Sequence, residues 1–192
     1  MAFVKDLFYD KLWMISGGKN MKMETRYSIR KYKPEPVEKS LIKDIIDDML
    51  LSPSGKNKKP WEFLVLDDPE VIHGLSESKK AGAGFVKQTS NVILVLSLHD
   101  ESDTWIEDGA ITLMVGHLKA HELGLGSCWI QLRNRESENM DSETFVREYL
   151  NIPDHYRMVG FLTIGYPDEE PTREKVHDYS KVHYNQVGGK YE

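Results

Sequence analysis

Residues 52–61 read Ser52-Pro53-Ser54-Gly55-Lys56-Asn57-Lys58-Lys59-Pro60-Trp61 and lie between a clear helix pattern and a clear strand pattern. The stretch is too rich in proline, glycine, serine and asparagine to form either element, so we expect a loop. Its small residues allow a flat ligand to approach the backbone, and Asn57 offers both a hydrogen-bond donor and an acceptor. By itself the stretch is equally consistent with a solvated turn.

Length and composition indicate one soluble domain with a sizeable core. The chain has 192 residues, of which 40% are hydrophobic and 29% are charged. A net charge of −6 argues against nucleic acid as the main partner. The single cysteine, Cys128, excludes an intramolecular disulfide and fits a reducing compartment. Because no apolar run reaches transmembrane length, we expect a cytoplasmic protein that does not bind membranes.

The first 20 residues stand apart from the rest of the chain. Their apolar side chains recur at roughly helical spacing, and Gly17-Gly18 follows them. Asp6 and Asp10 interrupt any signal-peptide core, so we do not expect secretion. We therefore divide the chain into an N-terminal extension of unknown role, residues 1–20, and a single domain with a C-terminal tail, residues 21–192.

A basic stretch follows, with Arg26, Ser28 and Arg30 at alternating positions. Guanidinium groups bind phosphate in a bidentate way, and a serine hydroxyl can add a hydrogen bond, so the stretch is a natural anion site. If the backbone is extended, these three side chains point to one side, and Tyr27 and Ile29 point to the other. The alternative is a solvated basic turn.

Hydrophobic periodicity predicts both helices and strands. We expect helices at residues 40–51, 70–78, 104–123 and 141–150, and strands at residues 62–66, 91–98 and 158–164. Residues 91–98 are almost wholly apolar, which is typical of a central strand buried on both faces. A short extended piece is expected at residues 125–130. The polar tail from residue 168 is either mobile or wrapped around a partner subunit.

Two histidines and the cysteine are candidates for chemistry. His117 and His121 lie four residues apart on the predicted helix at 104–123 but lack a spaced third ligand. We therefore expect no metal site and interpret both as surface histidines. Cys128 has no assignable activating base, so a packed cysteine is the better interpretation.

Four motifs, taken in order along the chain, resemble those of the nitroreductase family of FMN-dependent oxidoreductases, in particular its compact branch. The family pattern R-x-S-x-R-x-[FY] is matched by Arg26, Ser28, Arg30 and Tyr32. The pattern P-S-x-x-N-x-Q-P-W is matched by Pro53, Ser54, Asn57, Pro60 and Trp61. The third motif comprises Glu107-Asp108-Gly109-Ala110 and Gly124-Leu125-Gly126-Ser127-Cys128-Trp129. The fourth comprises Gly165-Tyr166-Pro167 and Arg173, and the resemblance covers residues 23–176.

The resemblance implies an α+β fold with a central, mostly antiparallel sheet flanked by helices, built as an intertwined homodimer with FMN at the subunit interface. It assigns Arg26, Ser28 and Arg30 to the phosphate, ribityl chain and pyrimidine edge of FMN. The other cofactor-binding residues that it implies are Tyr27, Pro53, Ser54, Gly55, Asn57, Ser127, Cys128, Trp129, Arg173 and Lys175. Of these, the residues at 53–57 would reach the flavin of the other subunit. Lys59 departs from the family pattern, which has glutamine there.

The implied activity is that of an FMN-dependent NAD(P)H oxidoreductase. A nicotinamide delivers hydride to flavin N5, and a small electron-poor acceptor, such as a nitroaromatic or a quinone, then takes the electrons in ping-pong turnover. No catalytic side chain is expected, because the flavin does the chemistry and the protein orients it. Trp105 and Phe85 are candidates for shaping the acceptor pocket.

Three other functions stay open at this point. Some relatives carry out reductive dehalogenation or dehydrogenation without nicotinamide. A non-catalytic FMN-binding carrier or sensor would hold the flavin without turnover. A structural α/β protein would contain no flavin.

Overall fold

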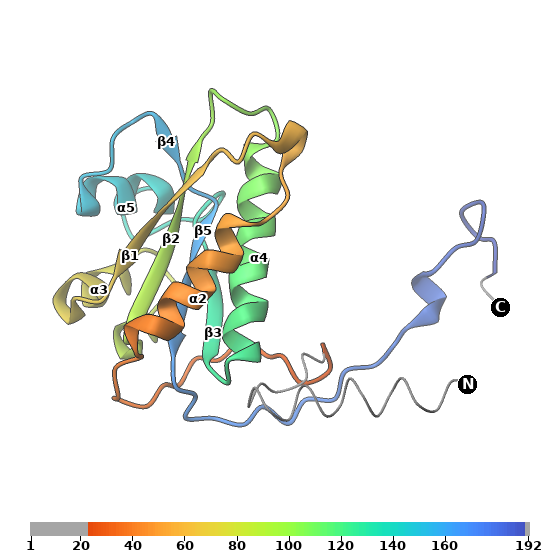
Figure 1. Ribbon diagram of the computed structural model, residues 1–192, viewed down its shortest axis with the longest axis horizontal. Helices are drawn as coiled ribbons and strands as arrows, with labels where there is room; N and C mark the ends of the chain where they lie inside the picture. The colour runs from red at the N-terminus through yellow and green to blue at the C-terminus, as the bar shows by residue number, and fades with distance from the viewer. Residues whose placement is uncertain (1–22, 191–192) are drawn as a thin grey trace.

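The computed structural model describes residues 23–190, which form three layers (Figure 1). Helices α2 (Lys39–Leu50) and α4 (Trp105–Glu122) cover one face of a central sheet, and α3 (Pro69–Leu75) and α5 (Ser142–Leu150) cover the other. The predicted α+β architecture is therefore confirmed. The expected extension at residues 1–20 lies outside the described residues. No helix within residues 23–190 is both long and apolar enough to cross a membrane.

The sheet has five strands: β1 (Trp61–Leu66), β2 (Asn91–Leu98), β3 (Gly126–Gln131), β4 (Tyr156–Arg157) and β5 (Gly160–Gly165). Four of them lie in the order β1-β2-β5-β3, β4 pairs with β2, and all these pairs are antiparallel. Strand β2 is the predicted central strand, and its side chains are buried from Asn91 to Ser97.

The core divides between the two faces of the sheet. Along β2, Val92, Leu94 and Leu96 pack against α3 and its neighbours, whereas Ile93 and Val95 pack against α2 and α4. This alternation follows from the two-residue period of a strand. It explains why the sequence of β2 is apolar on both sides.

Close packing fixes α4 against the sheet. A Cβ atom added at Gly116 would lie 2.6 Å from the Met49 sulfur and 2.9 Å from a Leu162 methyl group. The absence of a side chain at this position therefore lets α4 approach both α2 and β5. The next residue, His117, is carried to the edge of β3 by this approach, as described below.

The predicted element boundaries differ most from the structure near Met158. We expected one strand at residues 158–164, but β5 begins at Gly160 and the short β4 precedes it. The reason is that the Met158 N–H donates to the Glu143 carboxylate at 2.9 Å instead of joining the strand ladder. Helix α3 also ends at Leu75 rather than at residue 78.

Candidate functional site

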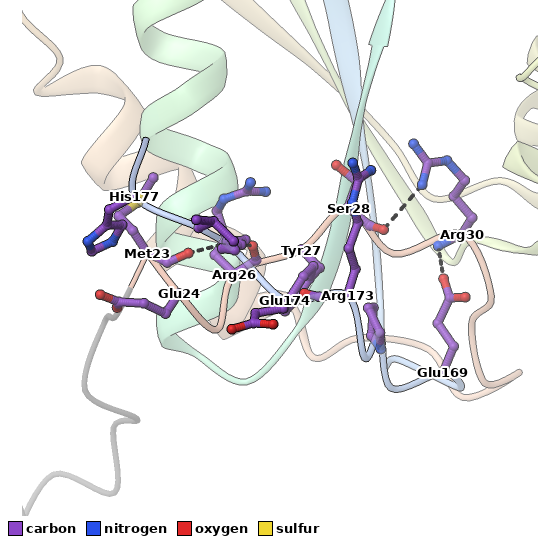
Figure 2. Close-up of a pocket in the computed structure, with 13 residues that line it drawn as sticks. Met23, Glu24, Arg26, Tyr27, Ser28, Arg30, Glu169, Arg173, Glu174 and His177 are labelled. Atoms are coloured by element: carbon purple, nitrogen blue, oxygen red, sulfur yellow. Dashed lines mark hydrogen bonds between the residues drawn. The ribbon is translucent and has the colours of Figure 1, made fainter. Parts of the chain in front are cut away.

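A cavity of about 860 Å³ lies where the N-terminal segment meets the C-terminal tail (Figure 2). Residues 23–30 form one wall, and residues 169–177 form the other. Four cationic side chains that the resemblance assigns to FMN binding line this cavity: Arg26, Arg30, Arg173 and Lys175. Segments from the two ends of the domain therefore meet at one cavity, whose lining also includes the carboxylates of Glu24, Glu169 and Glu174.

The N-terminal wall is extended, as predicted. Ser28 forms a parallel bridge with Ser127, and the Ile29 N–H donates to the Ser127 carbonyl at 2.9 Å. Ile29 is buried, and Arg30 is exposed. Tyr27 borders two cavities: it lines this one with Arg26 and Ser28, and it lines a neighbouring one with Ile29, the residue predicted to share its side of the segment.

The C-terminal wall is bound to this segment by three side chains. The Tyr27 hydroxyl donates to the Arg173 carbonyl at 2.6 Å. The Lys175 amine lies 4.4 Å from the centre of the Tyr27 ring and donates to the Met23 and Arg26 carbonyls. The carboxylate of Glu169 accepts hydrogen bonds from the backbone N–H of Arg30 at 2.5 Å (Figure 2) and from the backbone N–H of Lys31 at 3.1 Å.

The guanidinium of Arg26 is only partly satisfied. Its Nη1 lies 2.5 Å from the Nε2 of His117. Its Nε is buried and has no hydrogen-bond partner within the described residues. A buried donor without an acceptor is unfavourable, so this position favours an acceptor that comes from outside residues 23–190. A phosphate oxygen has the required chemistry.

Ser127, Cys128 and Trp129 lie along β3 and alternate in direction. Ser127 lines a second cavity of about 460 Å³, which shares Tyr27 and Glu169 with the first. Cys128 is 3% exposed and packs on the opposite face, where burial raises the pKa of its thiol. The prediction of a packed cysteine is confirmed. Trp129 is half-buried, and its indole N–H donates to the Gln131 side chain at 3.1 Å.

The loop at residues 52–60 lies at the other end of α4 (Figure 1). The Gly55 N–H donates to the Asp108 carboxylate at 2.8 Å, and the Ser54 hydroxyl accepts the Lys59 N–H at 2.8 Å. Within one chain, the predicted loop residues are thus not brought to the cavity; these are Pro53, Ser54, Gly55 and Asn57.

Backbone strain marks the same loop. Lys56, Asn57 and Lys59 have φ values of 53°, 55° and 49°, in the left-handed region. Non-glycine residues adopt this region at a cost and cluster at functional sites when they do. The strain supports a role for the loop beyond that of a solvated turn.

Two residues near the cavity were missed from the sequence. His117 is only 4% exposed, so our interpretation of it as a surface histidine was wrong. Partial burial lowers the pKa of the Lys79 amine, and the nearby positive charges of Arg135 and Arg30 add to the shift. No sequence signal separates Lys79 from the adjacent Lys80.

The two aromatic candidates lie apart. The guanidinium of Arg30 is 6.0 Å from the centre of the Phe85 ring, at the cavity end of the molecule. Trp105 begins α4 near the strained loop and lies beneath Arg157, 5.4 Å from its guanidinium. Their role in an acceptor pocket stays a prediction.

The three-layer α+β fold thus carries, at one end, a cavity lined by four cationic side chains and by the carboxylates of Glu24, Glu169 and Glu174. The family model described as "Nitroreductase family" matches residues 23–116 and 99–166. A Methanothermobacter thermautotrophicus protein assigned as an NADH dehydrogenase/NAD(P)H nitroreductase is 32% identical over 164 residues, which cover 84% of this chain and 83% of the relative. The chain therefore belongs to the nitroreductase family.

Two further proteins bear on the chemistry. A solved structure of an FMN-dependent nitroreductase from Clostridium difficile is 42% identical, with a TM-score of 0.82, and the match covers 85% of this chain and 97% of that one. Iodotyrosine deiodinase 1 of Sus scrofa is 25% identical over 178 residues, or 78% of this chain and 61% of the deiodinase.

Proposed function

We propose that this protein is an FMN-dependent oxidoreductase that takes hydride from NADH or NADPH and passes electrons to small electron-poor acceptors such as nitroaromatics or quinones. One observation carries the proposal: the buried Nε of Arg26, which has no partner among residues 23–190, borders a cavity whose lining has four cationic and three acidic side chains. The similarity to an FMN-dependent nitroreductase at 42% identity supports it.

The cavity residues fit the phosphate of FMN. Arg26 and Arg173 come from the two opposite walls, and each can donate two parallel hydrogen bonds to a phosphate. The Lys175 amine, which donates to the Met23 and Arg26 carbonyls, adds a third positive charge to the lining. Ser28 supplies a hydroxyl from the same wall as Arg26. In this proposal these side chains bind and orient the cofactor from its phosphate end.

When bound, FMN supplies the redox chemistry, since its ring accepts a hydride and passes electrons on. The chain contributes electrostatics. Arg30 and Lys79 place positive charge beside Cys128 and β3, and preorganised positive charge stabilises negative charge that develops on a reduced ring. We assign no catalytic acid or base to a side chain.

We also propose a homodimer in which each site takes residues from both copies. The strained loop and the cavity lie at opposite ends of α4, so a two-fold pairing could bring the loop of one copy to the cavity of the other (Figure 1). The tail from residue 176 extends away from the body and exposes Val176 and Tyr179. A polar tail that leaves the body in this way supports a segment that wraps around a partner subunit.

The test is the visible spectrum of the purified protein before and after anaerobic addition of NADH or NADPH. We expect flavin bands that bleach when NADH or NADPH is added. The Arg26→Ala variant should bind FMN at least tenfold more weakly, because a charge-assisted contact is lost. Lys31→Ala, which removes an exposed charge from the same segment, is the matched control.

Three outcomes would count against the proposal. A colourless protein that takes up no added FMN overturns it. Unchanged FMN affinity in Arg26→Ala overturns the phosphate assignment. Flavin bands that neither nicotinamide bleaches overturn the electron donor, and would favour the dehalogenation or carrier alternatives.

A further inference from the structure

We propose that His117 is a positioning residue: it binds one edge of the Arg26 guanidinium and so presents the other edge to the phosphate of the cofactor. The inference rests on the proposed function, because it assigns a task to Arg26 in that site. It concerns a residue on α4 that lines neither wall of the 860 Å³ cavity.

The hydrogen bonds fix the tautomer of His117. Arginine has only donors and stays charged, so the Nη1 of Arg26 must donate to the Nε2 of His117 across their 2.5 Å separation. The Nε2 atom is then an acceptor and carries no proton. The proton of a neutral ring must therefore be on Nδ1, which donates to the Ser127 hydroxyl oxygen.

The neutral form of the ring is also the one that its surroundings favour. Burial lowers the pKa of His117 to about 4, and the positive charges of Arg26, His121 and Lys175 contribute to the same shift. A protonated ring would have no lone pair on Nε2 and would repel the guanidinium. A neutral histidine is thus the state in which the contact with Arg26 exists.

The contact selects which edge of Arg26 remains available. A guanidinium has five N–H donors, and the edge formed by Nε and Nη2 can grip two oxygens of one phosphate. His117 binds Nη1, which is outside that edge. The Nε atom within the edge is the one that lacks a partner among residues 23–190. Nη1 is bound by His117, and Nε has no partner among residues 23–190. This is the arrangement expected of a guanidinium that is held for side-on binding of an anion.

The arrangement also couples the walls of the site. His117 belongs to α4, its partner Ser127 belongs to β3, and Ser127 is bridged to Ser28 in the N-terminal wall. The imidazole of His117 therefore contacts both Arg26, which we assign to the phosphate of FMN, and Ser127 of β3, which lines the neighbouring cavity of about 460 Å³. A leucine at this position could fill the space but could hold neither partner.

The test compares FMN with riboflavin, which lacks the phosphate. Dissociation constants of the full-length protein for both flavins are measured by fluorescence quenching, for wild type and for His117→Leu. We expect wild type to bind FMN more tightly than riboflavin. His117→Leu should weaken FMN about tenfold and riboflavin less than twofold, because the lost contact acts on Arg26 and hence on the phosphate.

Two further variants separate positioning from fold stability. Thr112→Val removes another buried polar group of α4, whose hydroxyl donates to the Met49 carbonyl at 3.0 Å, and should leave the ratio of the two affinities unchanged. His117→Gln keeps an acceptor for Arg26 and should recover part of the FMN affinity. If His117→Leu does not fold, the affinities of His117→Gln for FMN and riboflavin are compared with those of wild type instead. In an Arg26→Ala background, His117→Leu should cause no further loss of FMN affinity.

The possible results are distinct. Equal losses of FMN and riboflavin affinity in His117→Leu, or an additive loss in the double variant, would show a purely structural histidine and overturn the inference. If wild type itself does not distinguish FMN from riboflavin, the phosphate site of the proposed function fails, and the inference fails with it.

Discussion

At the scale of single residues, the buried neutral ring of His117 links the site to the stability of the fold. The pKa of this group is about 4 in the folded chain, against 6.5 for an ordinary histidine. Between these values the unfolded chain binds a proton that the folded chain does not. The contribution of His117 to the free energy of unfolding is therefore fully present above pH 6.5, and it is lost progressively as the pH falls toward 4.

We expect this one histidine to reduce the free energy of unfolding by about 2 kcal/mol between pH 7.5 and pH 4.5. Urea unfolding of the wild type at both pH values measures the total change, and the same comparison on His117→Gln removes this group from it. The difference between the two proteins is the contribution of His117. Equal pH dependences would mean that the ring is already charged, or readily solvated, in the folded state.

At the scale of elements, the loop at residues 52–60 depends on the first turn of α4. Asp108 is 2% exposed, and its carboxylate accepts the Gly55 N–H at 2.8 Å, the Thr104 hydroxyl at 2.9 Å and the Ser102 hydroxyl at 3.1 Å. A Cβ atom at Gly55 would lie 2.2 Å from the Thr104 hydroxyl, so the contact is close. The carboxylate thus holds a strained loop against the helix.

Asp108→Ala should release the loop and lower the free energy of unfolding by about 2–4 kcal/mol, because three donors lose a charged acceptor. Amide hydrogen exchange checks this at the level of peptides: exchange should accelerate at residues 52–60. Strand β2, residues 91–98, is the internal control. Its amides should remain protected from exchange when the variant and the wild type are compared under conditions of equal global stability. Uniform acceleration of both segments would indicate loss of the whole fold rather than of the loop.

The elements differ in how far their sequences predict them. Strand β2 is apolar at nearly every position, so its sequence predicts both its limits and its central place. The start of β5 depends on a carboxylate from α5, Glu143, which binds the Met158 N–H, and no local pattern contains that contact. Helix α4 is apolar on most of its circumference, so periodicity does not reveal that His117 faces the sheet rather than solvent.

At the scale of the whole molecule, the motifs predict the content of the site better than its geometry. Arg26, Arg30, Arg173 and Lys175 are far apart in sequence yet line one cavity, as the family resemblance implies. Lys79 and His117 belong to no motif, because each reaches the site only through the packing of its element. Pro53 and Asn57 lie at the opposite end of α4 from the cavity. The order of the motifs along the sequence does not specify this placement.

The distance between the loop and the cavity leads to a complementation test of the proposed dimer. Arg26→Ala damages the cavity, and Asn57→Ala damages the loop, so each homodimer carries one lesion in both of its sites. In a mixed dimer made by co-expression with two different tags, one site holds both lesions and the other holds neither. We therefore expect the purified mixed dimer to bind FMN tightly at one of its two sites and to regain reductase activity that both parents lack.

The control pairs Arg26→Ala with Ser28→Ala, two lesions on the same wall of the cavity. If each site takes its cavity from one copy and its loop from the other, this second mixed dimer has one lesion in every site and should recover nothing. Recovery in both mixtures would indicate that the lesions are simply diluted. Failure of the first mixture, with a mixed dimer verified by mass, would mean that the loop and the cavity act within a single chain, and the shared site would have to be abandoned.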